Sequence, residues 1–405
     1  MKIYIRIFCL FLSATLLSQD CREYPYYYYN NQVGISCKDN KYGFIDGSGN
    51  VIIAYQYDAA EDFDDAGFAK VTRANTDYLI DAKGREYLMT EKVHLLNANI
   101  IALDLRYQNL STIPSSAFTH SQLKILLLND NQLAELPRDI GKLAALEFLF
   151  LANNKFTSLP PEIGNLTKLK SLSLHANQLE EVPKEIGNLA QLQGLDFSAN
   201  QLQEIPKEIG QLNKLQFLDL SSNQLLELPK EISQLTKLQV LDLTENQLST
   251  LPKTLPRLTK LYSLSLGKNK FTALSKELGK LVQLQYLSLH SNQLTTLSSE
   301  IAQLQNLQIL NLFDNEFTAF PQEVFRLKNL QALFLQSNKI SAVPKEITQL
   351  NKLQNFSMSD NLLTTLPKEM NQLKRLKYLY LRENKFSDIE KINIADNLSK
   401  VYIVW

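Results

Sequence analysis

The chain has few of the features on which disulfide scaffolds, nucleic-acid-binding proteins and metalloenzymes depend. Its 405 residues include only three cysteines, which rules out a fold held together by disulfides. Its 42 basic side chains balance 42 acidic ones, and this balance argues against a nucleic-acid partner, which would favour a basic patch. No glycine-rich phosphate loop, HExxH or GxSxG motif is present. The length suits either several domains or one elongated solenoid.

The main feature of the chain is a repeat in which asparagine recurs at one constant interval without a slip. Leucines around each asparagine follow the pattern L-x-x-L-x-L-x-x-N-x-L, as at Leu218 and Leu220 before Asn223. A period of roughly 20–29 residues with this pattern is the signature of a leucine-rich repeat, and the chain resembles bacterial leucine-rich repeat proteins of the L-P-x-E-I-G-x-L type. One step before the first asparagine, the position is Gln108. The repeated asparagines are Asn131, Asn154, Asn177, Asn200, Asn223, Asn246, Asn269, Asn292, Asn315, Asn338, Asn361 and Asn384.

The repeat predicts an α/β solenoid, a leucine-rich repeat horseshoe with a parallel β-sheet on its concave face. In each coil the run Leu-x-Leu alternates inward and outward like a short strand. Parallel strands about 4.8 Å apart in thirteen coils give an inner face of roughly 60 Å. Each set of leucines is buried only by the coils above and below, so stability is a sum over neighbouring coils. We expect the solenoid to occupy residues 91–391.

The asparagines are expected to form a structural ladder. Each stands where the chain leaves the strand, and its short amide can bond nearby backbone groups there. Stacked at one position per coil, these side chains should be buried. Replacing one should therefore leave backbone groups unpaired, at a cost of about 1–3 kcal/mol.

The other half of each coil reads L-P-K-E-I-x-x-L and predicts a short helix on the convex side. Proline fits the first turn of a helix, and a glutamate such as Glu208 suits its positive end. Two successive coils have Ser275 and Ser298 in place of the proline, and Pro256 intrudes in the coil before them. We expect irregular convex structure over residues 252–300, with simple drift of the repeat as the alternative.

The segment 1–18 is typical of a secretory signal peptide. Lys2 and Arg6 supply positive charge, and residues 7–17 supply an apolar run that is too short to span a bilayer comfortably. Cleavage after Ser18 would place the protein outside the cell or in the cell envelope. No later stretch is long and apolar enough to cross a membrane. If this prediction fails, the alternative is an intracellular signalling scaffold.

Cys21 leaves two questions open. Bacterial lipoproteins carry a lipid on a cysteine just after the apolar run, so a lipid anchor at Cys21 is one alternative to free secretion. Asp20 departs from the small residues that the lipoprotein motif requires before that cysteine. Without a lipid, Cys21 and Cys37 would either pair or remain two free thiols.

Between the signal and the repeats the composition changes twice. Residues 19–32 form a tyrosine-rich linker with no helical or strand period. Residues 33–90 alternate strand-like runs with Gly and Asp, and they resemble the bacterial WG repeat, a small β-rich module. Tyr42 stands where that family has tryptophan. The residues that carry the resemblance are Lys41, Gly43, Phe44, Ile45, Asp46, Gly49, Val51, Ile52, Tyr57, Asp58, Phe63, Phe68 and Ala69.

The two ends of the solenoid need shielding, because an open end exposes leucines. We expect residues 91–102 to cover the first coil and residues 392–405 to form a C-terminal cap. No cysteine cluster flanks the repeats, unlike many animal leucine-rich repeat receptors, and this favours a bacterial type.

The sequence offers little catalytic chemistry. His175 and His290 share a repeat position but lie five coils apart, about 24 Å, so they cannot bind one metal. Asp196, Asp219 and Asp242 should stack on adjacent strands about 5 Å apart, where they could share a proton or a cation. Solvated, independent carboxylates are the alternative. A hydrolase built on this stack is one alternative function, and no catalytic residue, cofactor or metal is assigned.

The favoured function is a non-catalytic binding module that presents the concave face to a protein partner. Outward strand positions carry large aromatic side chains, which dominate protein interfaces when they are desolvated. Solitary aromatics tolerated on a sheet are the alternative. The candidate partner-binding residues are Phe148, Phe150, Asp196, Phe217, Asp219, Asp242, Tyr286, Phe313, Phe334, Tyr378 and Tyr380.

Overall fold

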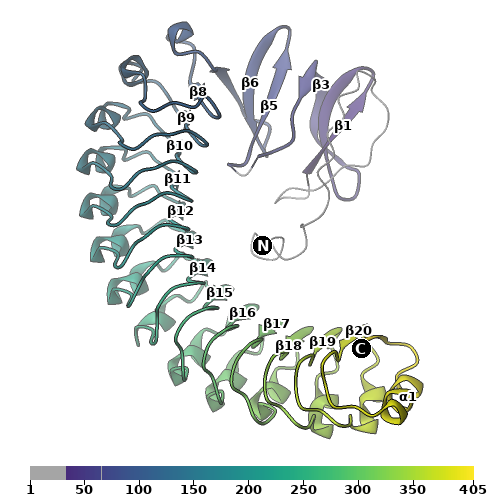
Figure 1. Ribbon diagram of the computed structural model, residues 1–405. Helices are drawn as coiled ribbons and strands as arrows, with labels where there is room; N and C mark the ends of the chain where they lie inside the picture. The colour runs from purple at the N-terminus through teal and green to yellow at the C-terminus, as the bar shows by residue number, and fades with distance from the viewer. Residues whose placement is uncertain (1–32, 65) are drawn as a thin grey trace. The chain divides into compact units, whose positions relative to one another are not determined.

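The computed structural model describes residues 33–64 and 66–405, which divide into two compact units (Figure 1). Within the described residues, unit 1 comprises 33–108 and 114–128, and unit 2 comprises 109–113 and 129–405. The expected signal peptide, the tyrosine-rich linker and Cys21 lie outside these residues. Within the described part of the chain, no helix is long and apolar enough to cross a membrane.

Unit 1 begins with a β-rich module. Strands β1, β2 and β3 form one antiparallel sheet, and β4 to β7 form a second antiparallel run. Its core holds Phe44 and Tyr57, both fully buried, and Phe44 packs edge-on against Phe63 with ring centroids 5.0 Å apart. Gly43 is required by close packing, because a Cβ there would lie 2.6 Å from the carbonyl oxygen of Ile53. The strands are β1 (Val33–Lys38), β2 (Lys41–Asp46), β3 (Val51–Tyr57), β4 (Ala59–Ala60), β5 (Phe68–Arg73), β6 (Thr76–Asp81) and β7 (Glu86–Thr90).

Unit 1 also contains the first two strands of the solenoid. Strand β7 pairs in parallel with β8 (Ala102–Asp104), and β8 pairs in parallel with β9 (Ile125–Leu127). The short 3-10 helices η2 (Val93–Leu95) and η3 (Ser115–Thr119) lie between them in sequence. The edge of the first coil is therefore paired by residues 86–90, whereas we expected residues 91–102 to shield it.

A buried ion pair lies within unit 1. The Arg106 guanidinium bonds Asp104 at 2.6 Å and also contacts the carboxylate of Asp64. Burial raises the pKa of Asp64, although Arg106 opposes that rise. Asp64 also accepts a hydrogen bond from the backbone of Phe68 at 2.9 Å. This carboxylate is therefore a structural group that fixes a loop.

Unit 2 is a curved stack of coils whose parallel strands line the inner side of its arc (Figure 1). Every strand from β10 to β20 has three residues in direct register, so Leu195, Leu218 and Leu241 form one buried row. The strands are β10 (Phe148–Phe150), β11 (Ser171–Ser173), β12 (Gly194–Asp196), β13 (Phe217–Asp219), β14 (Val240–Asp242), β15 (Ser263–Ser265), β16 (Tyr286–Ser288), β17 (Ile309–Asn311), β18 (Ala332–Phe334), β19 (Asn355–Ser357), β20 (Tyr378–Tyr380) and β21 (Tyr402–Val404).

The convex side of unit 2 carries one 3-10 helix per coil. The prolines stand just before these helices, in extended conformation, whereas we expected them in the first turn; Pro206 has φ −64° and ψ 144°. The helices are η4 (Arg138–Lys142), η5 (Pro161–Asn165), η6 (Lys184–Asn188), η7 (Lys207–Gln211), η8 (Lys230–Gln234), η9 (Leu255–Arg257), η10 (Lys276–Lys280), η11 (Ser299–Gln303), η12 (Gln322–Arg326), η13 (Lys345–Gln349) and η14 (Lys368–Gln372). Only η9 is short among them, so the irregularity expected over 252–300 is concentrated near Pro256.

The asparagines form hydrogen bonds that link successive coils. Asn223 accepts from the backbone N–H of Leu202 at 3.0 Å and donates to the carbonyl oxygens of Phe197 at 2.9 Å and Leu220 at 3.1 Å. The asparagines from Asn131 to Asn361 are buried, whereas Asn384 is half-buried. In unit 1, Gln108 is exposed and donates instead to the carbonyl oxygen of Glu91.

The last coil is followed by α1 (Asp388–Asn397) and β21. The side chain of Ser387 caps α1 by accepting from the backbone N–H of Glu390 at 3.2 Å. Ile394 and Leu398 are buried, so they cover the end of the leucine core. Strand β21 then adds to the sheet in parallel with β20.

Candidate protein-binding surface

The candidate surface is the strand face of unit 2, defined by the first and third residues of strands β10 to β21. In each three-residue strand the middle side chain enters the core and the outer two point away from it, because strand side chains alternate. In β13, Leu218 is fully buried, while Phe217 and Asp219 are half-buried. The face is therefore a set of two columns of side chains that run across the strands.

The aromatic candidates differ greatly in exposure. Tyr378 and Tyr380 are 44% and 37% exposed, whereas Phe150 is only 6% exposed. Because neighbouring strands lie about 4.8 Å apart, large outward side chains and their neighbours in the column cover one another. The expectation that Phe150 offers an exposed contact is therefore wrong. The half-buried candidates are Phe148, Phe217, Tyr286, Phe313 and Phe334.

Three tyrosines gather at the C-terminal end of this face, and we name Tyr378, Tyr380 and Tyr402 the C-terminal tyrosine cluster. Tyr402 is 65% exposed and stands in register with Tyr378. The two rings meet edge-to-face with centroids 6.1 Å apart. The sequence reasoning missed Tyr402, because the repeat interval counted on from Tyr378 falls on Val401 instead.

Asp196, Asp219 and Asp242 form the aspartate column on β12, β13 and β14, in direct register as expected. Asp219 accepts from the backbone N–H and the hydroxyl of Ser221, at 2.9 and 2.6 Å. Burial, followed by the charges of Asp242 and Asp196, raises the pKa of Asp219 to about 7. Asp242 is buried and Asp196 and Asp219 are half-buried, so none of the three carboxylates is fully solvated.

A buried serine just after β12, Ser198, touches both a histidine and an aspartate. The hydroxyl of Ser198 donates to Asp196 at 2.6 Å and lies 2.8 Å from Nδ1 of His175. Since the hydroxyl has one hydrogen and gives it to the carboxylate, the histidine must donate to Ser198. In a catalytic triad the histidine instead accepts the serine proton and contacts the aspartate itself. This arrangement is therefore a hydrogen-bonded chain without an activated nucleophile.

A second histidine fixes Phe313. The rings of His290 and Phe313 stack with centroids 6.2 Å apart and planes 10° apart. A Cβ at Gly267 would overlap the His290 ring, so glycine makes room for it. Burial, with a contribution from Lys268, lowers the pKa of His290, which favours the neutral ring. Phe313 is thus held in place by a neutral aromatic neighbour.

Metal and thiol chemistry have little support in the described part of the chain. No group of three or more His, Cys, Asp or Glu side chains there is arranged to hold a metal ion. Cys37 takes part in a disulfide. Its pairing with Cys21 stays a prediction, because Cys21 lies outside the described residues.

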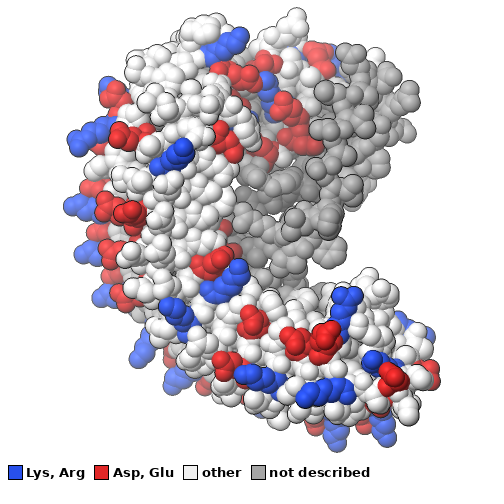
Figure 2. All heavy atoms as spheres, in the orientation of Figure 1, with Lys and Arg blue, Asp and Glu red and all other residues white. Residues whose placement is uncertain are grey.

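Charges of both signs are interspersed along the outer edge of the coils (Figure 2). Several lie in ion pairs within or between coils, such as Lys142 with Asp139 at 2.9 Å and Arg138 with Glu162 at 3.7 Å. This view shows no extended surface of one sign, which agrees with the equal numbers of acidic and basic residues.

Comparison with known proteins bears on both parts of the chain. The leucine-rich repeat region family matches residues 161–226, 207–275 and 268–402, and a second leucine-rich repeat family matches 99–156. The WG containing repeat family matches residues 42–75. No curated protein matches the chain.

Several solved structures share the fold. A leucine-rich repeat protein of Leptospira interrogans is 42% identical, with a TM-score of 0.68 over 76% of this chain and 84% of that one. An internalin, InlF, of Listeria monocytogenes is 23% identical, with a TM-score of 0.66 over 75% and 86% of the two chains, and it shows the fold alone. The plant peptide hormone receptor RGFR1, solved in complex with RGF2, is 29% identical, with a TM-score of 0.62 over 75% and 54%.

These matches cover most of the solenoid and the segment before it, and they agree with the strands, the asparagine ladder and the β-rich module described above. The sequence-based predictions of a leucine-rich repeat solenoid and of a WG-type module are both confirmed. This chain belongs to the leucine-rich repeat proteins and carries a WG repeat ahead of its solenoid.

Proposed function

We propose that this protein is a secreted or cell-surface binding module that holds a protein partner on the strand face of unit 2, with the C-terminal tyrosine cluster as its anchor. The observation that carries the proposal is the exposure of Tyr378, Tyr380 and Tyr402. Clustered exposed aromatics on a folded surface mark interaction sites. Tyrosines also contribute strongly to binding when a partner desolvates them.

The comparisons support a protein or peptide as the partner. Leucine-rich repeat proteins are typically interaction modules without catalytic activity, and the structure of RGFR1 is that of a peptide hormone receptor with RGF2 bound. This chain spans about half of that receptor, so its ligand class is inferred by analogy.

The remaining candidates have a secondary role in this proposal. The half-buried Phe217, Tyr286 and Phe334 add apolar surface along the face, and the aspartate column supplies a polar, acidic middle that orients the partner. Phe148, Phe150 and Phe313 are assigned to shaping the face. No catalytic residue, cofactor or nucleic-acid partner is proposed.

The localisation proposal rests on the segment 1–18, which lies outside the described part of the structure. N-terminal sequencing of the native protein should begin near residue 19. An intact Met1 in a cytosolic fraction would contradict secretion and favour an intracellular scaffold. A blocked N-terminus with a diacyl group on Cys21 would identify a lipoprotein.

The binding proposal is tested by finding the partner and then weakening the anchor. A photoreactive amino acid placed at position 380 should cross-link the partner in the host's surface fraction, and purified partner then gives a dissociation constant. Replacing Tyr378 and Tyr380 together by alanine should weaken binding at least about tenfold. The melting temperature should hardly change, because both side chains are exposed.

A matched pair on the convex side provides the control. Lys207→Ala with Lys230→Ala changes two exposed charges on η7 and η8 and should leave binding unchanged. If the lysine pair abolishes binding while the tyrosine pair does not, the strand face is not the binding surface.

A further inference from the structure

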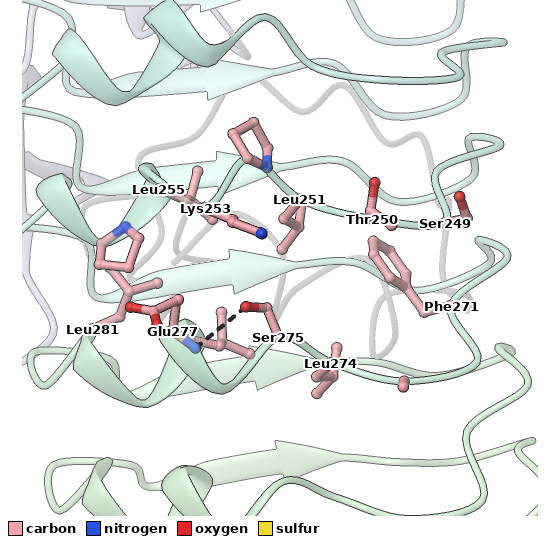
Figure 3. Close-up of a pocket in the computed structure, with 14 residues that line it drawn as sticks. Ser249, Thr250, Leu251, Lys253, Leu255, Phe271, Leu274, Ser275, Glu277 and Leu281 are labelled. Carbon is pink, nitrogen blue, oxygen red and sulfur yellow. Dashed lines mark hydrogen bonds between the residues drawn. The ribbon is translucent and has the colours of Figure 1, made fainter.

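The convex side of unit 2 contains a cavity that the proposed function does not use. It lies between η9 and η10 and has a volume of about 250 Å³ (Figure 3). Its walls are mainly apolar and include Leu251, Leu255, Phe271, Leu274 and Leu278. The cavity falls in the coil whose repeat pattern is interrupted by Pro256.

Pro256 explains why the cavity exists. In the preceding coils a small residue occupies the repeat position of Pro256 and packs tightly against the next coil. At Gly210, for example, even a Cβ atom would lie only 2.5 Å from the carbonyl oxygen of Glu231. A proline ring cannot fit into such a contact, and η9 is reduced to three residues. A cavity lies between this shortened segment and η10. Glycine occupies this place at Gly141, Gly164, Gly187, Gly210 and Gly279.

The cavity leaves apolar side chains partly uncovered. Leu251 and Leu274 are half-buried, whereas Leu228 and Leu297, at the same repeat position in the flanking coils, are only 6% exposed. Covering such surface is favourable. Another coil shows how the space can be filled from within, since Phe320 and Phe325 stack there with centroids 5.2 Å apart.

The polar residues beside the cavity favour an anion. Lys253 is exposed, and the next position holds Thr254 where the repeat normally has glutamate. Glu277 also lines the cavity, but its carboxylate pairs with Lys280 at 2.5 Å. Lys253 forms no ion pair within the described part of the chain. A positive charge therefore stands beside an apolar hollow.

The geometry points to a ligand site between η9 and η10 for a small amphiphile, with its alkyl chain in the cavity and its carboxylate at Lys253. An apolar cavity of about 150 Å³ holds benzene, so this cavity holds a chain of roughly six to ten carbons by proportion. The carboxylate would accept a charge-assisted hydrogen bond from the Lys253 ammonium group. The site is independent of the strand face and of the partner proposed there.

The probe is octanoate, titrated into the full chain by calorimetry, with methyl NMR of labelled leucines alongside. Saturable one-to-one binding with shifts at Leu251 and Leu274 is expected. Pro256→Gly restores the small residue of the repeat and should reduce the affinity at least about tenfold by closing the cavity. Leu251→Phe fills the space as Phe320 does and should have the same effect if Pro256→Gly fails to fold.

The charge requirement has its own controls. Lys253→Gln should weaken octanoate binding by about tenfold, as expected for the loss of a charge-assisted bond. Lys207→Gln, at the same repeat position two coils earlier, should have no effect. Octanol should bind about as weakly to the parent protein as octanoate binds to Lys253→Gln. Absence of saturable octanoate binding, or binding that survives both cavity-filling changes in folded protein, would overturn the inference.

Discussion

The two halves of one coil are held to their neighbours in different ways. The strand half repeats without variation, with three residues per strand from β10 to β20 and a buried asparagine after each strand up to Asn361. The helical half varies, from five residues in η8 to three in η9. On the strand side, asparagine side chains bond each coil to the one before it, whereas on the helical side small residues such as Gly210 pack closely against the next coil. Consequently, a single residue such as Pro256 can leave a cavity between two helical segments while the strands remain in register.

The largest predicted effect tests the strand half. Asn223→Ala removes one side chain that bonds four backbone groups directly, and it should lower the free energy of unfolding by about 1–3 kcal/mol. Asn246→Ala should cost a similar amount, because the ladder continues unchanged into the coil that contains Pro256. Urea denaturation of both variants provides the measurement.

Gln224→Ala is the control for the ladder. Gln224 is exposed and adjoins Asn223, so its replacement should be nearly neutral. Equal denaturation midpoints for Asn223→Ala and Gln224→Ala would show that the asparagine is not a buried connector.

The next prediction tests the helical half at one repeat position in two coils. Gly210→Ala should destabilise by about 1–2 kcal/mol, because the new Cβ pushes against the backbone of Glu231. Pro256→Ala should change stability by less than about 1 kcal/mol, since a cavity already lies between η9 and η10. Thermal melts compare the two variants, and equal losses would contradict the claim that this side has opened at Pro256.

The smallest predicted effect depends on pH. The pKa of Asp219 is about 7 in the folded protein and about 3.9 when unfolded, so the unfolded chain ionises first as pH rises. Stability linked to this group is therefore present below about pH 4 and is lost between about pH 4 and 7. Asp219→Asn should be more stable than the parent at pH 8 by on the order of 1 kcal/mol. The difference should disappear at pH 3.

Asp360→Asn is the matched control for that experiment, because Asp360 is an exposed aspartate at another position of the repeat. Both variants are compared with the parent by urea denaturation at pH 3, 5 and 8. The same pH dependence in both variants would show that stacking of carboxylates in the aspartate column is not the cause.

The architecture of the solenoid could be predicted from the sequence because one pattern recurs along most of the chain. Leucine spacing and the asparagine period determine the strands and their register. Some local conformations could not be predicted. The residue before each asparagine in unit 2 adopts positive φ, as at Ala199 with 55° and Lys268 with 51°. Neither residue favours that region by itself, so the contacts between coils impose the conformation.

The candidate surface was less predictable than the fold. The alternation of side chains along a strand correctly indicates which residues point away from the core. It does not show how much of each outward side chain is covered by its neighbours, and Phe150 is buried for that reason. Tyr402 follows α1, where the repeat register has ended, so no periodic signal leads to it. The cavity beside Pro256 was indicated only as irregular structure, since its volume depends on how far two helical segments separate.

The ladder also bears on how the gene can change in length. Because each asparagine bonds the same positions of the coil before it, removal of one complete repeat unit joins two coils whose hydrogen-bonding groups still match. A deletion one residue shorter than the repeat would instead misplace the amide and turn the following leucines out of the core. Recombination between repeats can thus shorten or extend the molecule in whole coils, with α1 and β21 kept at the end.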